Sequence, residues 1–243
     1  MNKSLLHRLI LFVCLLALLL AIAVVFHAIQ RSLQKPRNVT LSNLSESQVT
    51  ISWTTDEPTD QQVIITTSLN SLPNDIPLLS KGTIASSNGI SQVHSVTLRN
   101  LKPSGVYYYR IYQKPYSVYQ GRIKLAEKLT SLSKPYPVYG RVLGPDRKAP
   151  LSGALVYLRA FNPKEASKSS SLISTTTNAD GRWSLDLSLL RKANLKEPYQ
   201  LTEGLLEEIV VEAGSLGRVR ATTTIHRDEP WPDVFLVSTE KRK

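Results

Sequence analysis

The side chains best suited to acid–base or metal chemistry are the histidines, and the sequence contains four: His7, His27, His94 and His226. They are far apart in the sequence, so their spacing does not form a metal-binding cluster. The chain also lacks HExxH, GxSxG, a phosphate-binding glycine loop and a cysteine beside a base, the patterns that position a metal or a nucleophile. We therefore expect no catalytic residue, no metal, no cofactor and no enzymatic activity.

Oxygen-bearing side chains gather in the segment TTTNADGRW, where Asn178 and Asp180 are types of residue that calcium binds. The regular ligand spacing of a calcium loop is missing. Asp180 followed by Gly181 also predicts the tight turn of a β-hairpin, because that turn needs a positive φ angle. We assign a structural role to Asp180, Gly181 and Trp183. A calcium site is the less favoured alternative.

The best candidate for a binding surface is a run of tyrosines on one predicted strand and the next. If Tyr107, Tyr109 and Ile111 point inward, strict alternation sends their neighbours outward. Tyrosine and arginine are enriched at binding hot spots. The favoured alternative is that tyrosine suits a half-exposed pleated surface. The candidate interaction surface consists of Tyr108, Arg110, Tyr112, Tyr116 and Tyr119.

The elements that position these side chains follow from length and composition. A chain of 243 residues suits an N-terminal anchor followed by two domains of about 100 residues each. The net charge is +11, and residues 1–37 hold five basic and no acidic residues. That placement favours anionic lipid head groups over nucleic acid, so we expect no nucleic-acid partner. Cys14 is the single cysteine, which excludes an intrachain disulfide.

Residues 9–29 are predicted to form a transmembrane helix with the lipid bilayer as its partner. The run LILFVCLLALLLAIAVVF, at 9–26, has 18 residues without a charge and can continue as helix through residue 29. At about 1.5 Å per residue this helix would cross the roughly 30 Å hydrocarbon core. A cleaved signal peptide is the alternative, but its apolar region is usually only about 7–15 residues long.

Residues 36–126 have the alternating pattern of an antiparallel β-sandwich. In SQVTISWTT, Val49, Ile51 and Trp53 share one face, while threonine and serine occupy the other. The predicted turns include DEPTD at 56–60 and SLPNDIP at 71–77, and no helix interrupts the strands. The other strands are predicted at residues 39–44, 62–67, 95–101, 107–113 and 119–125.

This first domain resembles a fibronectin type III domain. The resemblance rests on NVTLSNLSESQVTISWTTDEP and HSVTLRNLKPSGVYYYRIY, and it covers about 90 residues. It implies that Trp53 is the core tryptophan of the second strand. In LKPSGVY, which contains Leu101 and Tyr107, it implies a tyrosine corner whose hydroxyl bonds to upstream backbone. These three residues are expected to be structural.

Residues 127–135 are predicted to form a short linker, and residues 136–243 are predicted to form a second β-sandwich. Val156 and Leu158, then Trp183, Leu185 and Leu187, alternate with neighbours that can face solvent. The phrases VYGRVLGPDRKAPLSGALVYL and TTTNADGRWSLDL resemble carboxypeptidase-regulatory-like, transthyretin-like domains. Two polar insertions, 162–171 and 191–208, are predicted to be surface loops. Because the linker is short, we expect the domains to sit end to end.

Modules of these two kinds are mostly displayed outside cells, and the basic residues flanking the apolar run hardly decide its orientation. We therefore expect an all-β, single-pass membrane protein with a cytoplasmic N-terminus and with extracellular or periplasmic C-terminal domains. Residues 1–8 form the cytoplasmic tail and residues 30–35 the juxtamembrane segment.

The predicted function is a binding, adhesion or assembly module without catalytic activity, with an envelope protein or a polysaccharide as its partner. The alternative is a carbohydrate- or cell-wall-binding accessory of a polysaccharide-processing system.

Overall fold

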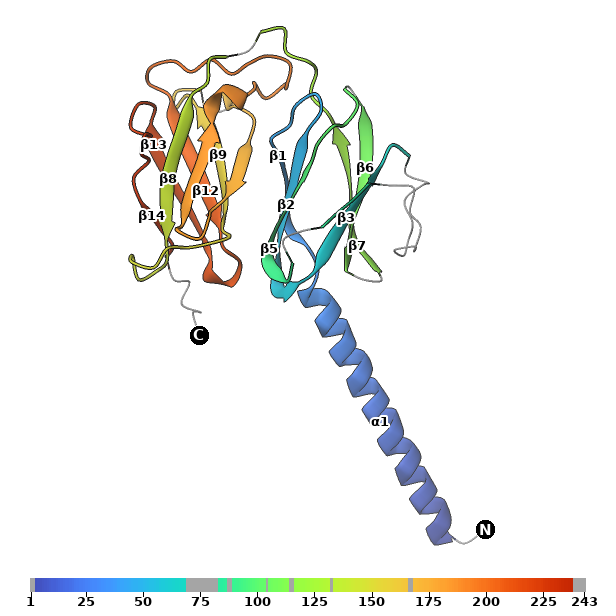
Figure 1. Cartoon of the computed structure of the whole chain (residues 1–243). Coiled ribbons are helices and arrows are strands. Elements are labelled where there is room, and N and C mark those ends of the chain that lie inside the picture. The colour runs from blue at the N-terminus through green and yellow to red at the C-terminus, as the bar shows by residue number, and fades with distance from the viewer. Residues whose placement is uncertain are drawn as a thin grey trace.

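The computed structural model shows a chain built mostly of β-strands, with one α-helix at its N-terminal end (Figure 1). Two groups of strands lie beside each other, and the helix leaves the base of the first. The predicted turn at 71–77 lies outside the described residues. The structure describes residues 3–68, 83–86, 89–103, 105–113, 116–131, 133–165 and 168–237.

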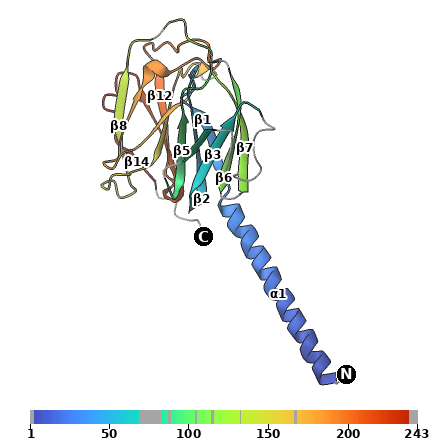
Figure 2. The ribbon, with the colours of Figure 1, turned by 45° about the vertical axis from the view of Figure 1, so that its right-hand side comes forward.

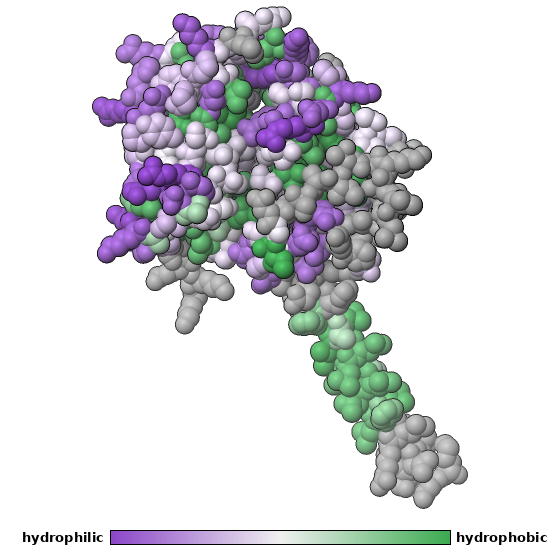
Figure 3. Space-filling view, in the orientation of Figure 1, coloured by the Kyte–Doolittle hydropathy of each residue, from purple (hydrophilic) through white to green (hydrophobic). Residues whose placement is uncertain are grey.

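Helix α1 (Lys3–Leu33) is a single 31-residue helix. Figure 3 shows that apolar side chains cover its described surface, and Leu11, Leu20 and Phe26 are each more than 60% exposed. None of them belongs to a sandwich core. The chain is tied to the first sandwich just after the helix ends, where the Gln61 side-chain amide donates to the Gln34 carbonyl at 2.7 Å.

The predicted membrane topology is contradicted. Spanning a bilayer takes about 20 consecutive, predominantly apolar helical residues, and no helix in the described part of the chain meets the length and apolarity that this requires. The prediction of a single-pass membrane protein is therefore wrong. It had placed residues 9–29 in the bilayer and the domains outside the cell or in the periplasm.

The first sandwich has a three-stranded and a four-stranded sheet, an arrangement of the fibronectin type III or immunoglobulin-like kind. The alternating apolar residues from which this sandwich was predicted point into one core, where Val49, Ile51 and Trp53 are fully buried. DEPTD does not form a separate loop, because β2 extends to Thr59. One sheet has the order β1 (Arg37–Ser42), β2 (Val49–Thr59), β5 (Ser91–Leu98), and the other β4 (Thr83–Ser86), β3 (Gln61–Thr66), β6 (Val106–Gln113), β7 (Tyr116–Lys124).

The second sandwich also has two sheets around a separate core, centred on Trp183 and Trp231, whose rings meet edge to face with centroids 6.2 Å apart. Leu187 is not in a strand but begins the short 3-10 helix η3 (Leu187–Leu189), where Asp186 accepts the Ser188 N–H. The sheet orders are β10 (Ile173–Thr176), β9 (Leu155–Phe161), β12 (Leu206–Glu212), β13 (Arg218–Thr224), and β11 (Arg182–Asp186), β8 (Pro137–Leu143), β14 (Val234–Phe235).

Asp180 and Gly181 do lie in a turn, but this turn does not make the predicted hairpin. Gly181 has φ +69°, and the Asn178 carbonyl accepts its N–H. The strands on either side belong to different sheets, since β10 pairs with β9 and β11 pairs with β8. The turn therefore carries the chain across the edge of the sandwich.

The two sandwiches lie side by side instead of end to end, as Figures 1 and 2 both show. The outer face of the β1-β2-β5 sheet meets the outer face of the β10-β9-β12-β13 sheet, where Ser52 of β2 contacts Tyr157 of β9. The linker crosses at the end opposite to α1. A short linker is enough for this arrangement, because it only has to reverse the direction of the chain.

Candidate functional site

The five residues of the predicted interaction surface do not form one exposed face. Tyr108 and Tyr112 lie together with Ile64 in a small apolar cluster on the outer side of the β4-β3-β6-β7 sheet. Tyr112 is fully buried there, which corrects its prediction as a contact residue. Strand alternation correctly predicts that the Tyr112 side chain leaves the core side of the strand. On the outer side it packs with Ile64 and Tyr108 and is buried.

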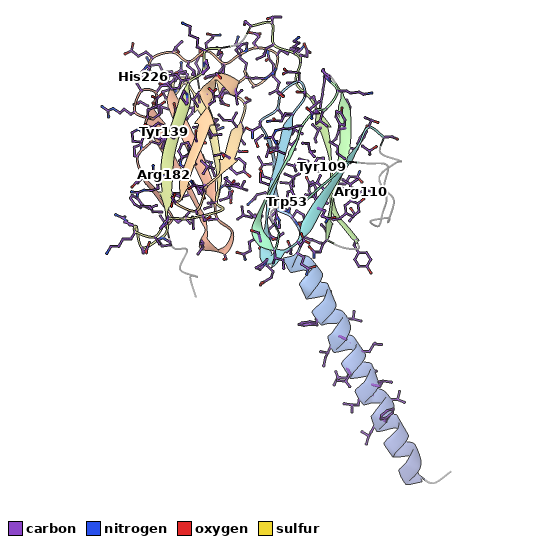
Figure 4. The ribbon with its side chains drawn as sticks, viewed as in Figure 1. Trp53, Tyr109, Arg110, Tyr139, Arg182 and His226 are labelled. Atoms are coloured by element: carbon purple, nitrogen blue, oxygen red, sulfur yellow. The ribbon has the colours of Figure 1, made fainter. Side chains whose placement is uncertain are left out.

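The other three residues are more accessible but point in different directions. Tyr116 is 50% exposed and Tyr119 is 37% exposed. Tyr119 pairs with Ile111, which faces the core, and its ring lies 6.2 Å from the Tyr109 ring. Arg110, labelled in Figure 4, is half-buried, and its Nε donates to the Gln120 side chain at 3.0 Å. The structure therefore does not assemble these side chains into one site.

The more extensive arrangement of polar groups is the seam, the contact between the outer faces of the two sandwiches. The Ser52 and Tyr157 hydroxyl oxygens lie 2.7 Å apart, and both residues are buried. Beside them, the Ser42 and Ser174 hydroxyl oxygens are also 2.7 Å apart. Asn43 accepts the Ser174 N–H and donates its amide to the Ser174 carbonyl, each at 2.9 Å. Every polar group in this set therefore has a specific partner in the other sandwich.

A buried cation closes the linker end of the seam. Arg191, whose side chain is 4% exposed, donates to Glu46 of the first sandwich at 2.7 Å. The same guanidinium donates to the carbonyl of Glu127 in the linker at 2.6 Å and to that of Leu195 at 3.2 Å. One side chain thus joins both sandwiches and the linker.

Two grooves run along the seam, one on each side. The charged groove lies beside β1, where Arg159 and Arg220 both pair with Glu208 and Arg218 pairs with Glu212. The hydroxyl groove lies beside β5 and carries Arg99 among uncharged polar groups. Its lining includes Thr50, Ser95, Thr97, Arg99, Thr175 and Thr176, around a cavity of about 420 Å³.

A further depression, the edge hollow, lies where β10 and β11 meet at the edge of the second sandwich. Its cavity volume is about 700 Å³. Figure 4 places Tyr139 and Arg182 on the side of the second sandwich that faces away from the first. Its lining includes Tyr139, Arg141, Thr176, Asn178, Arg182 and Trp183.

The two polar insertions, 162–171 and 191–208, lie close together on the second sandwich. The Tyr199 hydroxyl donates to the Lys168 carbonyl at 3.2 Å, and both residues line a hollow of about 570 Å³. The end of the second insertion is not a loop, because β12 starts at Leu206.

Inside the first sandwich, His94 stacks on Trp53 with ring centroids 5.1 Å apart and planes within 9°. Its Nε2 lies 3.1 Å from the Thr59 hydroxyl. Burial lowers the pKa of His94 to about 4, despite the opposing effects of the Ser91 backbone and of Asp60. His94 is therefore a neutral core residue at neutral pH.

Inside the second sandwich, Glu207 and Asp228 form a buried carboxyl pair beside Trp231. The Trp231 indole N–H donates to Glu207 Oε2 at 2.7 Å. Burial, followed by the neighbouring Asp228 carboxyl, raises the pKa of Glu207 to about 8. Glu207 therefore keeps its proton at neutral pH. Within the described ranges, no three His, Cys, Asp or Glu side chains could together hold a metal.

The seam and the edge hollow were not predicted from the sequence. Serine and threonine on the outer face of a strand normally indicate contact with water, so their pattern gave no sign of a second domain. Tyr139 and Arg182 alternate with the buried Val138 and Trp183, which places them outward. That pattern could have identified the face but not its neighbours.

Comparison with known proteins relates the first sandwich to a domain of a phosphatase family. Residues 36–122 match the family described as purple acid phosphatase, N-terminal domain. No curated protein sequence matches the chain.

Similar solved structures include three of different kinds. PhoD is 11% identical with a TM-score of 0.30, over 44% of this chain and 21% of that chain. A two-domain fibronectin type III segment of chicken tenascin is 10% identical with a TM-score of 0.27, over 79% and 99%. A streptococcal ancillary pilin is 14% identical with a TM-score of 0.26, over 74% and 56%. The present chain thus spans about a fifth of the PhoD chain.

The family match contradicts the prediction that the chain has no enzymatic activity. That prediction depended on a search for reacting side chains in recognisable motifs. The match is instead to the N-terminal domain of a phosphatase, and it lies in residues 36–122 as a whole. A motif search cannot detect a relationship of this kind.

Proposed function

We propose that this chain is a binding module in which the two sandwiches act as one rigid unit. The seam is the observation that carries the proposal. Its paired hydroxyls and the buried Arg191 hold the sandwiches together, and a ligand in the hydroxyl groove would touch both of them. A binding site built on rigid elements loses little conformational freedom when it is occupied.

The first sandwich is of the fibronectin type III kind, in which the Tyr107 hydroxyl accepts the Lys102 N–H at 2.7 Å. The second is a carboxypeptidase-regulatory-like sandwich, a reading supported by the sequence phrases around Gly140 and Gly181. In the second domain the outer face of the β11-β8-β14 sheet carries Tyr139, Arg141 and Arg182, side chains suited to a protein or a polysaccharide partner.

The test uses a seam variant and a control that adds the same charge elsewhere. Ser52→Lys places a lysine at a fully buried seam position, whereas Thr224→Lys places one on the exposed end of β13. The full chain is used as bait for proteins and is also sedimented with insoluble polysaccharides.

The proposal expects a partner that the wild type and Thr224→Lys retain and that Ser52→Lys loses, while circular dichroism shows both variants folded. Equal retention by the two variants would show that the seam is irrelevant to binding. A wild-type chain that retains neither proteins nor polysaccharides would end the proposal.

The family match favours a second candidate function, a role in phosphate ester hydrolysis. Hydrolysis of p-nitrophenyl phosphate by the purified full chain, with and without added divalent metals, is the direct test. Activity that co-purifies with the chain through two different columns would support this role. Hydrolysis at the rate of the buffer alone would exclude it for the chain by itself.

A further inference from the structure

One residue that lines the edge hollow, Trp183, carries a buried hydrogen-bond donor. Trp183 is 3% exposed, and its indole N–H has no partner among the residues that the structure describes. A buried donor of this kind normally bonds to protein, water or a ligand, since leaving it unpaired costs about 1–3 kcal/mol.

Two other side chains that line the hollow, Asn178 and Arg182, also offer donors, and Asp233 lines it as an acceptor. Arg141 is already paired with Asp233, Nη2 to Oδ2 at 2.5 Å. Arg182 makes no ion pair with any carboxylate in the described ranges. Asn178 uses its side-chain oxygen to accept the Asp180 and Arg182 N–H groups. Its amide NH₂ therefore remains as a donor, and the hollow suits a ligand rich in acceptors.

An exposed ring lies on the same outward face as Arg182, whereas Trp183 reaches the hollow from the inner face. Tyr139 is 46% exposed and lies directly opposite Ser184 on the neighbouring strand, while Arg141 lies opposite Arg182. An accessible aromatic ring beside hydroxyl and guanidinium groups can stack on one face of a sugar ring and bond to its substituents.

The edge hollow continues into the hydroxyl groove of the seam. Thr175 and Thr176 of β10 line both of them. The combined surface therefore runs from Arg99 on the first sandwich, around the β10 edge, to Arg182 on the second. Packed sheets lie about 10 Å apart, so a ligand that reaches both arginines must be an extended chain.

We infer that this combined surface binds an acidic polysaccharide, with Arg99 and Arg182 each taking a carboxylate or phosphate group and Tyr139 stacking on a sugar ring. The inference rests on the proposed binding function and names its ligand class. The hydroxyl-lined middle of the surface suits uncharged sugar hydroxyls, and the arginines at its two ends suit anionic groups.

The test measures binding of the full chain to four soluble polymers by titration calorimetry. These are polygalacturonate with carboxylates, phosphomannan with phosphates, uncharged dextran, and single-stranded DNA. The variants are Arg99→Gln, Arg182→Gln, Tyr139→Ala and Trp183→Phe. Arg122→Gln is the matched control, because Arg122 is an exposed arginine on β7, outside both the groove and the hollow.

The inference predicts that one acidic polysaccharide binds and dextran does not, and the polymer that binds decides between carboxylate and phosphate. Arg99→Gln and Arg182→Gln should each weaken this binding about tenfold, which corresponds to about 1.4 kcal/mol. Trp183→Phe and Tyr139→Ala should weaken it severalfold, and Arg122→Gln should leave it unchanged.

Three results would overturn the inference. An equal loss in Arg122→Gln would indicate general attraction to a chain of net charge +11. DNA binding with the same pattern of variants would identify a nucleic-acid surface. No binding to either acidic polysaccharide, together with a protein partner that Ser52→Lys loses, would remove this ligand class but keep the proposed binding function.

Discussion

The hydroxyl oxygens of Ser52 and Tyr157 lie 2.7 Å apart across the seam, although 105 residues separate them in the sequence. Both residues are buried, and each belongs to a strand in the centre of its sheet. A pair of this kind needs both sheets in fixed positions. It therefore links the packing of the two domains to the grooves on either side of the seam.

Tyr157→Phe removes one hydroxyl of this pair and should lower the free energy of unfolding by about 1–3 kcal/mol, because Ser52 loses its best partner in a buried site. Urea denaturation measures the change. Tyr199→Phe is the control, since the Tyr199 hydroxyl bonds to a carbonyl at an exposed site, and it should have little effect. Equal stability of the two variants would mean that the seam pair contributes nothing.

Arg191→Met should destabilise the chain by about 1–3 kcal/mol, since it leaves two backbone carbonyls and the partly exposed Glu46 without their donor. Trypsin should then cut faster after Lys128 in the linker, which loses its contact with Arg191. Lys192→Met is the control, because Lys192 pairs with Glu197 at the surface and its loss should cost less than about 1 kcal/mol. An unchanged cleavage rate in Arg191→Met would contradict its role in holding the linker.

The lowered pKa of His94 predicts loss of stability in acid. An unfolded histidine takes up its proton near pH 6.5, whereas the folded one resists until about pH 4. The unfolded state therefore binds more protons between these values, and the free energy of unfolding should fall as the pH falls through this window. His94→Gln should reduce this slope, and His226→Gln, at an exposed site, should keep it. Identical slopes for wild type and His94→Gln would refute the prediction.

The raised pKa of Glu207 predicts the opposite dependence, a loss of stability as the pH rises. The folded carboxyl keeps its proton up to about pH 8, while an unfolded glutamate loses it near pH 4.5. The stabilisation is complete below pH 4.5 and should be lost as the pH rises towards 8. Glu207→Gln retains an acceptor for the Trp231 indole and should flatten this part of the profile. The control Glu203→Gln, at an exposed position, should follow the wild type, and a Glu207→Gln profile with the same slope would contradict this assignment.

The sequence predicts well what depends on neighbouring residues. Val49, Ile51 and Trp53 alternate into one core as expected, and Gly181 has the positive φ that its turn requires. The tyrosine corner is also a local feature, since Tyr107 and Lys102 are five residues apart. In each case the deciding contacts lie within one strand or one turn.

The sequence does not predict what depends on distant surfaces. Tyr112 is on the outer face, as alternation requires, but Ile64 and Tyr108 form a cluster around it. Asp180 and Gly181 lie in a turn, but the sheet pairing of β10 and β11 prevents a hairpin. Ser42 and Ser52 have the composition of a solvated face, so only the position of the second sandwich shows that they are buried.

A disulfide between the two sandwiches would show whether the seam forms. Cys14 is the single natural cysteine, so Cys14→Ser gives a background without thiols. In that background, Ser42→Cys and Ser174→Cys place sulfur atoms where two hydroxyl oxygens are 2.7 Å apart, close enough for a bond. Ser42→Cys with Ser184→Cys, on the far sheet, is the control pair.

Mild oxidation of the full chain, followed by mass spectrometry of tryptic peptides, measures the bond. Side-by-side sandwiches predict an intrachain disulfide between positions 42 and 174 in the test pair and free thiols in the control pair. Free thiols, or only intermolecular bonds, in a folded test variant would show that the seam does not form and would contradict the account.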